Sequence, residues 1–430
     1  MTAEIAIMNR NAVVLAADSA TTVTSWKNGI QEIRYFKGAN KLFELSYSCP
    51  VGLMIFGSAG LQGVPWELAV KAFRHQSGQE THEHLPGYAD QFFRFVECNT
   101  QLFSDESKAA QLMRTIGPGA WRLQSMIAGA LQLPADDELL ELSLEDFERG
   151  LTTAEHQIQN LALPELMRET DLAHALTSLA GTFEAEAQDV LPLFGRHPER
   201  AHLIPRYVHA FIALAVKEFP LFAEQTGVVI AGYGTQDMYP RLEVYMCYGM
   251  MGNRLVYERE NNQSRAMSAD SPAVIEPFAT TGTINTFRFG VAPDAFEAVM
   301  NSTHAALVEF GKQVMIESGA QTPLDEIHLS NLARQATQQH TDRWFKETSQ
   351  RHFDPLSGVI HSLPLPDMAA LAKSLIDLES LKERVTKPSE SVSGPIDVAV
   401  ISKYDGFVWI DRKHYFDPAL NPRYFKKLDI

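Results

Sequence analysis

The sequence predicts an α+β fold in which blocks of strands and blocks of helices alternate along one interleaved chain. Strand-like runs, either alternating or continuously apolar, occupy much of residues 1–60 and return at 228–258 and 395–411. Stretches with apolar residues at helical spacing fill most of 61–222 and 293–386. Because the sequence holds no internal repeat and no low-complexity linker, we expect one fold rather than a row of independent domains.

The first 60 residues carry the clearest strand patterns. Residues 4–9 alternate, and residues 12–17 form a continuous apolar run like that of a strand buried on both faces. Asn-Arg-Asn at 9–11 is a turn signal, so these segments predict a core hairpin that would hold residue 2 in a fixed place. The same block predicts a polar hairpin near 24–32 and strands at 41–47 and 51–57.

Helices are expected next, and then a second set of strands. Pro65 stands near the first turn of the first expected helix, and the helical block ends in an amphipathic segment around 204–216. Two β-rich runs around Lys-Tyr-Asp-Gly at 403–406 predict a closing hairpin. Between these points the patterns predict strands at 228–233, 241–248 and 254–258 and helices at 293–316, 324–348 and 366–386.

Length and charge narrow the class of function. The chain has 430 residues, enough for a sizeable core. It carries 53 acidic and 37 basic side chains, a formal net charge of −16. This balance argues against nucleic acid or an anionic membrane surface as the main partner.

Cysteine usage and hydropathy predict a soluble, cytoplasmic protein. The three cysteines have no motif spacing, which fits a reducing compartment and predicts neither disulfides nor a zinc framework. The first 25 residues lack the basic stretch and apolar core of a secretory signal. The longest apolar helical stretch, around Tyr207–Val216, has about half the length that a bilayer crossing needs.

Signals for metals and nucleotides are weak, and no cofactor is expected. His75, His82 and His84 lie in a polar, loop-like segment with no second ligand cluster at a useful spacing. Gly-Ser-Ala-Gly-Leu-Gln-Gly at 57–63 is neither a P-loop nor a dinucleotide fingerprint, and no Gly-x-Ser-x-Gly elbow is present. The acidic run at 136–148 is most simply a solvated helix face.

Thr2 is the first candidate for catalysis. A hydroxyl is a poor nucleophile unless a base takes its proton, and the free α-amine of the same residue can do so. The unperturbed pKa of an α-amine, about 7.7–8.0, suits that task. Removal of Met1 would create this group, although Met-Thr alone begins very many proteins and carries little weight.

The residues around Thr2 strengthen the case that it is catalytic. Thr2, a strand, a turn and Val-Val-Leu-Ala-Ala-Asp resemble the start of a mature proteasome β subunit, with the family's spacing between nucleophile and invariant aspartate, here Asp18. Lys-Gly-Ala-Asn-Lys-Leu-Phe-Glu-Leu resembles the segment with the family's catalytic lysine, which implies that role for Lys41. Leu-Met-Ile-Phe-Gly-Ser-Ala-Gly resembles the turn whose glycine N–H forms the oxyanion hole, which implies that role for Gly57.

The resemblance extends to the late part of the chain, with departures. Ser-Glu-Ser-Val-Ser-Gly-Pro is similar to the family's Asp-x-x-Ser-Gly segment, which adds Glu390, in place of Asp, and Ser393 to the catalytic group. Ala20 replaces the arginine that usually follows the invariant aspartate. Thr281 is a weaker candidate, in place of serine, for an earlier loop of the family.

The resemblance to this N-terminal nucleophile (Ntn) hydrolase superfamily implies a four-layer αββα sandwich of two antiparallel sheets flanked by helices. On this basis the sandwich core comprises 1–60, 225–290 and 388–430. Residues 61–224 and 291–387 would be helical layers enlarged by insertions, because the chain has roughly twice the length of a typical β subunit.

The same resemblance implies a threonine-type amide hydrolase, in the first place an endopeptidase acting on a peptide or protein substrate. Asp18 would orient Lys41, whose ammonium would lower the pKa of the Thr2 hydroxyl and keep the α-amine neutral. A homo-oligomer is also implied, and the sequence leaves an unfoldase partner open. Two alternatives stay open as well: a hydrolase of a non-peptide amide, and a catalytically inert scaffold with the same fold.

The resemblance also implies a substrate pocket. Phe43, Ile55 and Ala59 would face the substrate side chain, and Thr22 would be a further substrate-binding residue. Because the first three are apolar, the pocket would favour medium apolar side chains and reject charged ones through their desolvation cost.

Overall fold

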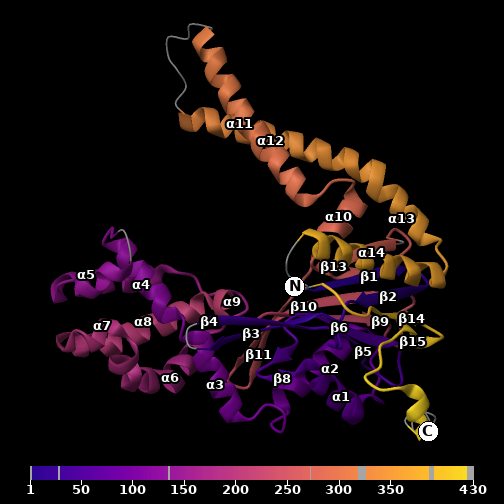
Figure 1. Ribbon diagram of the computed structural model, residues 1–430, viewed down its shortest axis with the longest axis horizontal. Coiled ribbons are helices and arrows are strands. Elements are labelled where there is room, and N and C mark those ends of the chain that lie inside the picture. Colours follow the sequence, from indigo (N-terminus) through magenta and orange to yellow (C-terminus); the bar gives the residue numbers. More distant parts are fainter. Residues whose placement is uncertain are drawn as a thin grey trace.

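The protein has a mixed α+β fold with several antiparallel sheets, as the alternating blocks predicted. A computed structural model describes residues 2–27, 30–133, 136–271, 273–317, 326–386 and 392–423. Figure 1 shows strands gathered in the centre, with helices above and below them, a helical lobe on one side and a long helical arm that projects away.

The first sheet has the strand order β13-β1-β2-β14-β15, and every pair in it is antiparallel. The hairpin predicted from the first residues is confirmed, because β1 and β2 pair and are buried along their whole length. The closing hairpin is confirmed as well. The strands are β1 (Ala3–Asn9), β2 (Ala12–Ala17), β13 (Ala273–Ala279), β14 (Asp397–Ser402) and β15 (Gly406–Asp411).

Strand β13 was not predicted, and its sequence explains why. Glu276 and Pro277 interrupt its apolar pattern, and proline cannot donate to a sheet ladder. The strand lies at the edge of the sheet, beside β1 only, where a missing donor on the outer side is tolerated.

The second sheet has the order β11-β10-β9-β6-β5, with β12 paired to β10. It contains β5 (Leu42–Glu44), β6 (Val51–Gly57), β9 (Thr226–Gly232), β10 (Arg241–Met251), β11 (Arg254–Arg259) and β12 (Arg265–Ala266). Two separate hairpins complete the strands: β3 (Thr21–Lys27) with β4 (Ile30–Phe36), and β7 (Gly60–Leu61) with β8 (Val64–Pro65). The polar hairpin predicted near 24–32 is therefore present and longer than expected.

Three hydrophobic clusters join the sheets to each other and to helices. One contains side chains of both sheets, among them Met8 and Leu15 from the first and Met54 from the second. Another joins the first sheet to α13 (Asp354–His361) and α14 (Leu365–Thr386). A third joins the second sheet to α1 (Trp66–Ser77) and α2 (Pro86–Cys98).

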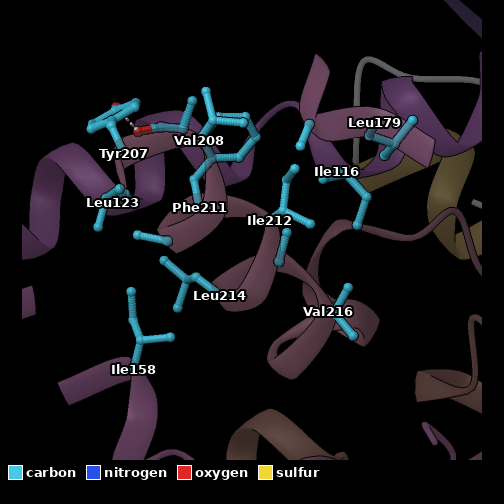
Figure 2. Close-up of a cluster of buried hydrophobic side chains, with 14 of the residues drawn as sticks. Ile116, Leu123, Ile158, Leu179, Tyr207, Val208, Phe211, Ile212, Leu214 and Val216 are labelled. Atoms are coloured by element: carbon cyan, nitrogen blue, oxygen red, sulfur yellow. Dashed lines mark hydrogen bonds between the residues drawn. The ribbon is translucent and has the colours of Figure 1, made fainter. Parts of the chain in front are cut away.

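The helical lobe has a core of its own, part of which Figure 2 shows. The predicted amphipathic face in 204–216 is confirmed, since its apolar residues are buried there, and the Tyr207 hydroxyl donates to the Ala120 carbonyl at 2.7 Å. The lobe comprises α3 (Asp105–Ile116), α4 (Gly119–Ala130), η1 (Asp136–Glu141), α5 (Leu144–Asn160), α6 (Glu169–Val190), α7 (Pro192–Gly195), η2 (Pro198–Leu203), α8 (Ile204–Lys217) and α9 (Phe219–Phe222).

The arm consists of α11 (Pro293–Glu317) and α12 (Glu326–Thr348), which pack against each other beyond the body of the molecule (Figure 1). It is joined to the body by α10 (Gly282–Phe289) and η3 (Ser349–Phe353), and η4 (Pro418–Leu420) lies near the end of the described chain. Within the described residues, no helix has the length and apolar character needed to cross a bilayer.

Candidate active site

Thr2 is fixed at the start of β1, as the predicted hairpin required. Its carbonyl accepts a hydrogen bond from Thr280 N–H at 2.9 Å, and the next residue is tied to β2 through the Asp18 N–H at 3.1 Å. Only 6% of Thr2 is exposed. The end of this strand is therefore held on both sides, which gives the hydroxyl a defined position.

Asp18 and Lys41 meet beside this strand end and form a buried ion pair. Lys41 Nζ lies 2.5 Å from Asp18 Oδ1, and the two side chains are 6% and 1% exposed. Asp18 comes directly after β2, and Lys41 directly before β5. The two sheets thus bring together residues that are 23 positions apart.

Three backbone N–H groups fix the Asp18 carboxylate in addition to Lys41. Ala3 donates to Oδ1 at 3.2 Å, Ala20 to Oδ2 at 3.2 Å, and Ser393 to Oδ2 at 3.0 Å. Position 20 makes this contact through its backbone, so alanine can supply it.

The late segment thus reaches the site through the backbone of Ser393. Glu390 lies outside the described residues. The side chain of Thr281 accepts a hydrogen bond from Asn285 at 3.0 Å at the start of α10, and it is its neighbour Thr280 that lines the pocket described below.

Glu4 is a second carboxylate in the site that the sequence analysis missed. It lies on β1, two residues after Thr2, so both side chains emerge on the same face of the strand. The Thr2 hydroxyl donates to Glu4 Oε2 at 3.1 Å. Lys41 Nζ lies 3.0 Å from Glu4 Oε1, a charge contact without the alignment of a hydrogen bond.

Burial raises the pKa of the Glu4 carboxyl to about 7, while the Lys41 ammonium acts in the opposite direction. Glu4 is fully buried. One signal in the sequence could have identified it: it is the only charged residue in an otherwise apolar strand. A charge at such a position needs a partner.

A pocket of about 920 Å³ opens beside Thr2. Small and polar residues predominate in its lining, and Glu224, which hydrogen-bonds to Ser58 at 2.7 Å, brings a carboxylate to it. The lining includes Thr2, Thr21, Thr22, Val23, Gly57, Ser58, Ala59, Gly60, Gly63, Pro65, Glu224, Ala279 and Thr280. A hydroxyl, a hydrogen-bond acceptor for its proton and an accessible space therefore occur together.

The predicted substrate-binding residues divide into two groups. Thr22 and Ala59 line the pocket, but Phe43 and Ile55 are not part of its lining. They are buried in the cluster that joins the second sheet to α1 and α2. Side chains alternate between the two faces of a strand, and both Phe43 and Ile55 lie on the face toward those helices. The expected apolar specificity, which depended on them, is therefore not supported by the lining.

Gly57 lines the same pocket at the end of β6 and has a φ of +80°. A Cβ there would lie 2.9 Å from the backbone oxygen of Gln225. Both the backbone conformation and the close approach of the neighbouring chain favour glycine.

Two of the three histidines considered as metal ligands, His82 and His84, have other partners. His82 Nε2 lies 2.8 Å from Gln91 Oε1, and His84 Nδ1 lies 2.8 Å from Asp237 Oδ1. In the described part of the chain, no group of three or more His, Cys, Asp or Glu side chains could hold a metal ion.

Comparison with known proteins adds no relative: no family model matches the chain, and a search of curated proteins finds no significant match.

Proposed function

We propose that the chain is a threonine-type amide hydrolase, in the first place a peptidase, with Thr2 as its nucleophile after removal of Met1. One observation carries the proposal. Thr2 lines an open pocket together with Gly57, and the buried Lys41–Asp18 ion pair lies beside it. A nucleophile, a fixed positive charge and a glycine turn are the groups that acyl transfer requires.

In the proposed reaction the substrate carbonyl binds in the pocket between Thr2 and Gly57. The hydroxyl loses its proton to a base, which in the resembling family is the α-amine, and the oxygen attacks the carbonyl carbon. The Gly57 N–H stabilises the negative oxygen that forms. The C–N bond then breaks, the amine leaves with a proton, and water hydrolyses the remaining ester on Thr2.

We further propose a four-layer αββα sandwich as the framework of this site. The support comes from the three hydrophobic clusters: one lies between the sheets, and one joins each sheet to helices on its other side. The lobe and the arm would then be additions to that framework. A cytoplasmic location belongs to the same proposal.

The experiment that tests the function combines mass and activity. Intact mass of the purified chain should show that Met1 is absent, and a panel of fluorogenic peptides and simple acyl amides should include at least one substrate. Hydrolysis of acyl amides alone would assign a non-peptide amidase. Complete inactivity of a protein that begins at Thr2 would leave the inert scaffold.

The role of Gly57 gives a specific prediction. Gly57→Ala is expected to lower kcat by about 10²–10³-fold, the cost of losing one oxyanion donor elsewhere, because a Cβ at this position displaces the backbone that carries the N–H. Gly406→Ala is the matched control, since Gly406 has a φ of +82° but nothing within 4 Å of a Cβ. Both variants should lose stability through strain, about 1–3 kcal/mol. Equal activity of the two would contradict the role of Gly57.

We also propose that the protein forms a homo-oligomer, with the arm as a contact region. The arm exposes large apolar side chains, including Phe310, Ile316, Ile327 and Phe345. Phe92, Phe93 and Phe103 are not available for such contacts, because they are buried in the cluster that joins the second sheet to α1 and α2. Light scattering at micromolar concentration should give a mass well above 48.0 kDa. A strict monomer would refute the assembly.

A further inference from the structure

The structure places a second carboxylate, that of Glu4, against both the Thr2 hydroxyl and the Lys41 ammonium. Lys41 already has a full partner in Asp18, whose two oxygens together accept hydrogen bonds from three backbone N–H groups as well. Among the described residues, the polar contacts of the Glu4 carboxylate are the Thr2 hydroxyl on one oxygen and the Lys41 ammonium on the other.

We propose that Glu4 is the general base that takes the proton of the Thr2 hydroxyl. This assignment rests on the proposed function, because it keeps Thr2 as the nucleophile and transfers one role, that of base, from the α-amine to this carboxylate. The geometry supports it directly: the hydroxyl already donates to Glu4 Oε2 at 3.1 Å, within the range expected for a base and its proton.

The charges of Glu4, Asp18 and Lys41 also support Glu4 as the base. Glu4 and Asp18 bring two negative charges, both fully or almost fully buried, to a single ammonium. A surplus buried negative charge is costly, and it makes proton uptake by one carboxylate favourable. Asp18 already accepts three backbone hydrogen bonds, whereas the hydroxyl of Thr2 donates to Glu4, so Glu4 is the carboxylate placed to receive that proton. Its raised pKa, about 7, suits a base that works at neutral pH.

The step balances in protons and electrons. The proton moves from Thr2 Oγ1 to Glu4 Oε2 as Oγ1 forms a bond to the carbonyl carbon and the C=O electron pair moves onto the oxygen. The oxygen pair then returns, the C–N bond breaks, and Glu4 gives its proton to the leaving nitrogen. In the second half Glu4 takes a proton from water, whose oxygen attacks the ester, and returns it to Oγ1 as the acid leaves.

The test compares Glu4→Gln with wild type on the fluorogenic peptide that wild type hydrolyses fastest. Glutamine keeps an oxygen that can accept the Thr2 hydroxyl bond but cannot act as a base at neutral pH. We expect kcat to fall by about 10²–10⁴-fold, the usual contribution of a general base, with KM nearly unchanged. The control is Glu276→Gln, because Glu276 is also buried, lies on neighbouring β13 and pairs with Arg265 at 2.9 Å outside the pocket lining.

The pH profiles of wild type and Glu4→Gln provide a second readout, which a structural role would not change. A base must be deprotonated, so kcat/KM of wild type should rise with pH through about 7 and then level, and this rise should be absent in Glu4→Gln. Unchanged kcat in a folded Glu4→Gln protein, or a wild-type profile without a rise near 7, overturns the assignment and leaves the proposed function intact. A wild-type chain starting at Thr2 with no activity on the panel overturns both.

Discussion

Thr2→Ala is expected to abolish amide hydrolysis, because no other group in the pocket takes the place of its hydroxyl in the proposed reaction. Loss of the nucleophile costs about 10⁶-fold in kcat in a well-studied serine protease, and we expect an effect of that order. The fold should persist. The side chain contributes one hydrogen bond, to Glu4, and its loss costs about 1–3 kcal/mol when the buried acceptor is left without a partner.

Thr2→Ser is the matched control for this prediction. Serine keeps the hydroxyl and loses a methyl group, so part of the activity should survive. The measurement is the initial rate on the best fluorogenic peptide, with the melting temperature recorded for each variant. Wild-type rates in Thr2→Ala would show that this residue is not the nucleophile.

The second large effect is expected at Lys41. Lys41→Ala removes the only ammonium that the structure shows in contact with the two carboxylates of the site. The rate should fall by several orders of magnitude, since the charge beside Thr2 is lost. Stability should fall too, by about 3–5 kcal/mol, because breaking a buried ion pair leaves an uncompensated charge. Protonation of Glu4 would reduce this loss at lower pH.

Lys37→Ala is the comparison, since Lys37 lies four residues earlier and is exposed. Its replacement should change the rate and the melting temperature by little, as expected for a surface position. Both variants should be assayed together for hydrolysis and thermal unfolding. Small and equal effects of the two substitutions on both quantities would mean that the Thr2–Lys41–Asp18 group has no catalytic role.

Several parts of the fold and site could be predicted because they depend on local sequence order. The turn at 9–11 and the apolar run at 12–17 determine the first hairpin. That hairpin holds Thr2 in place. Lys41 and Gly57 were singled out by a resemblance in local sequence at two strand boundaries, and their catalytic roles stay predictions.

Other parts depend on how the sheets pack, which the sequence does not reveal. Alternation places Phe43 and Ile55 on one face of their strands but does not say whether that face meets the substrate or the helices. Glu4 is visible in the sequence as a charge in an apolar strand, but its contact with Lys41, 3.0 Å away, depends on how the second sheet packs against the first. Strand β13 was missed because Glu276 and Pro277 interrupt its apolar pattern, and the proline is tolerated there because the strand lies at a sheet edge.

The most direct test of the account is the site at which an electrophilic peptide, such as a peptide β-lactone or vinyl sulfone, becomes attached to the protein. After incubation and digestion, tandem mass spectrometry should find a single adduct on the Thr2 side chain of a chain that begins at this residue. Attachment to another residue, or hydrolysis of peptides by a protein that never forms an adduct at Thr2, would contradict the claim that Thr2 is the nucleophile.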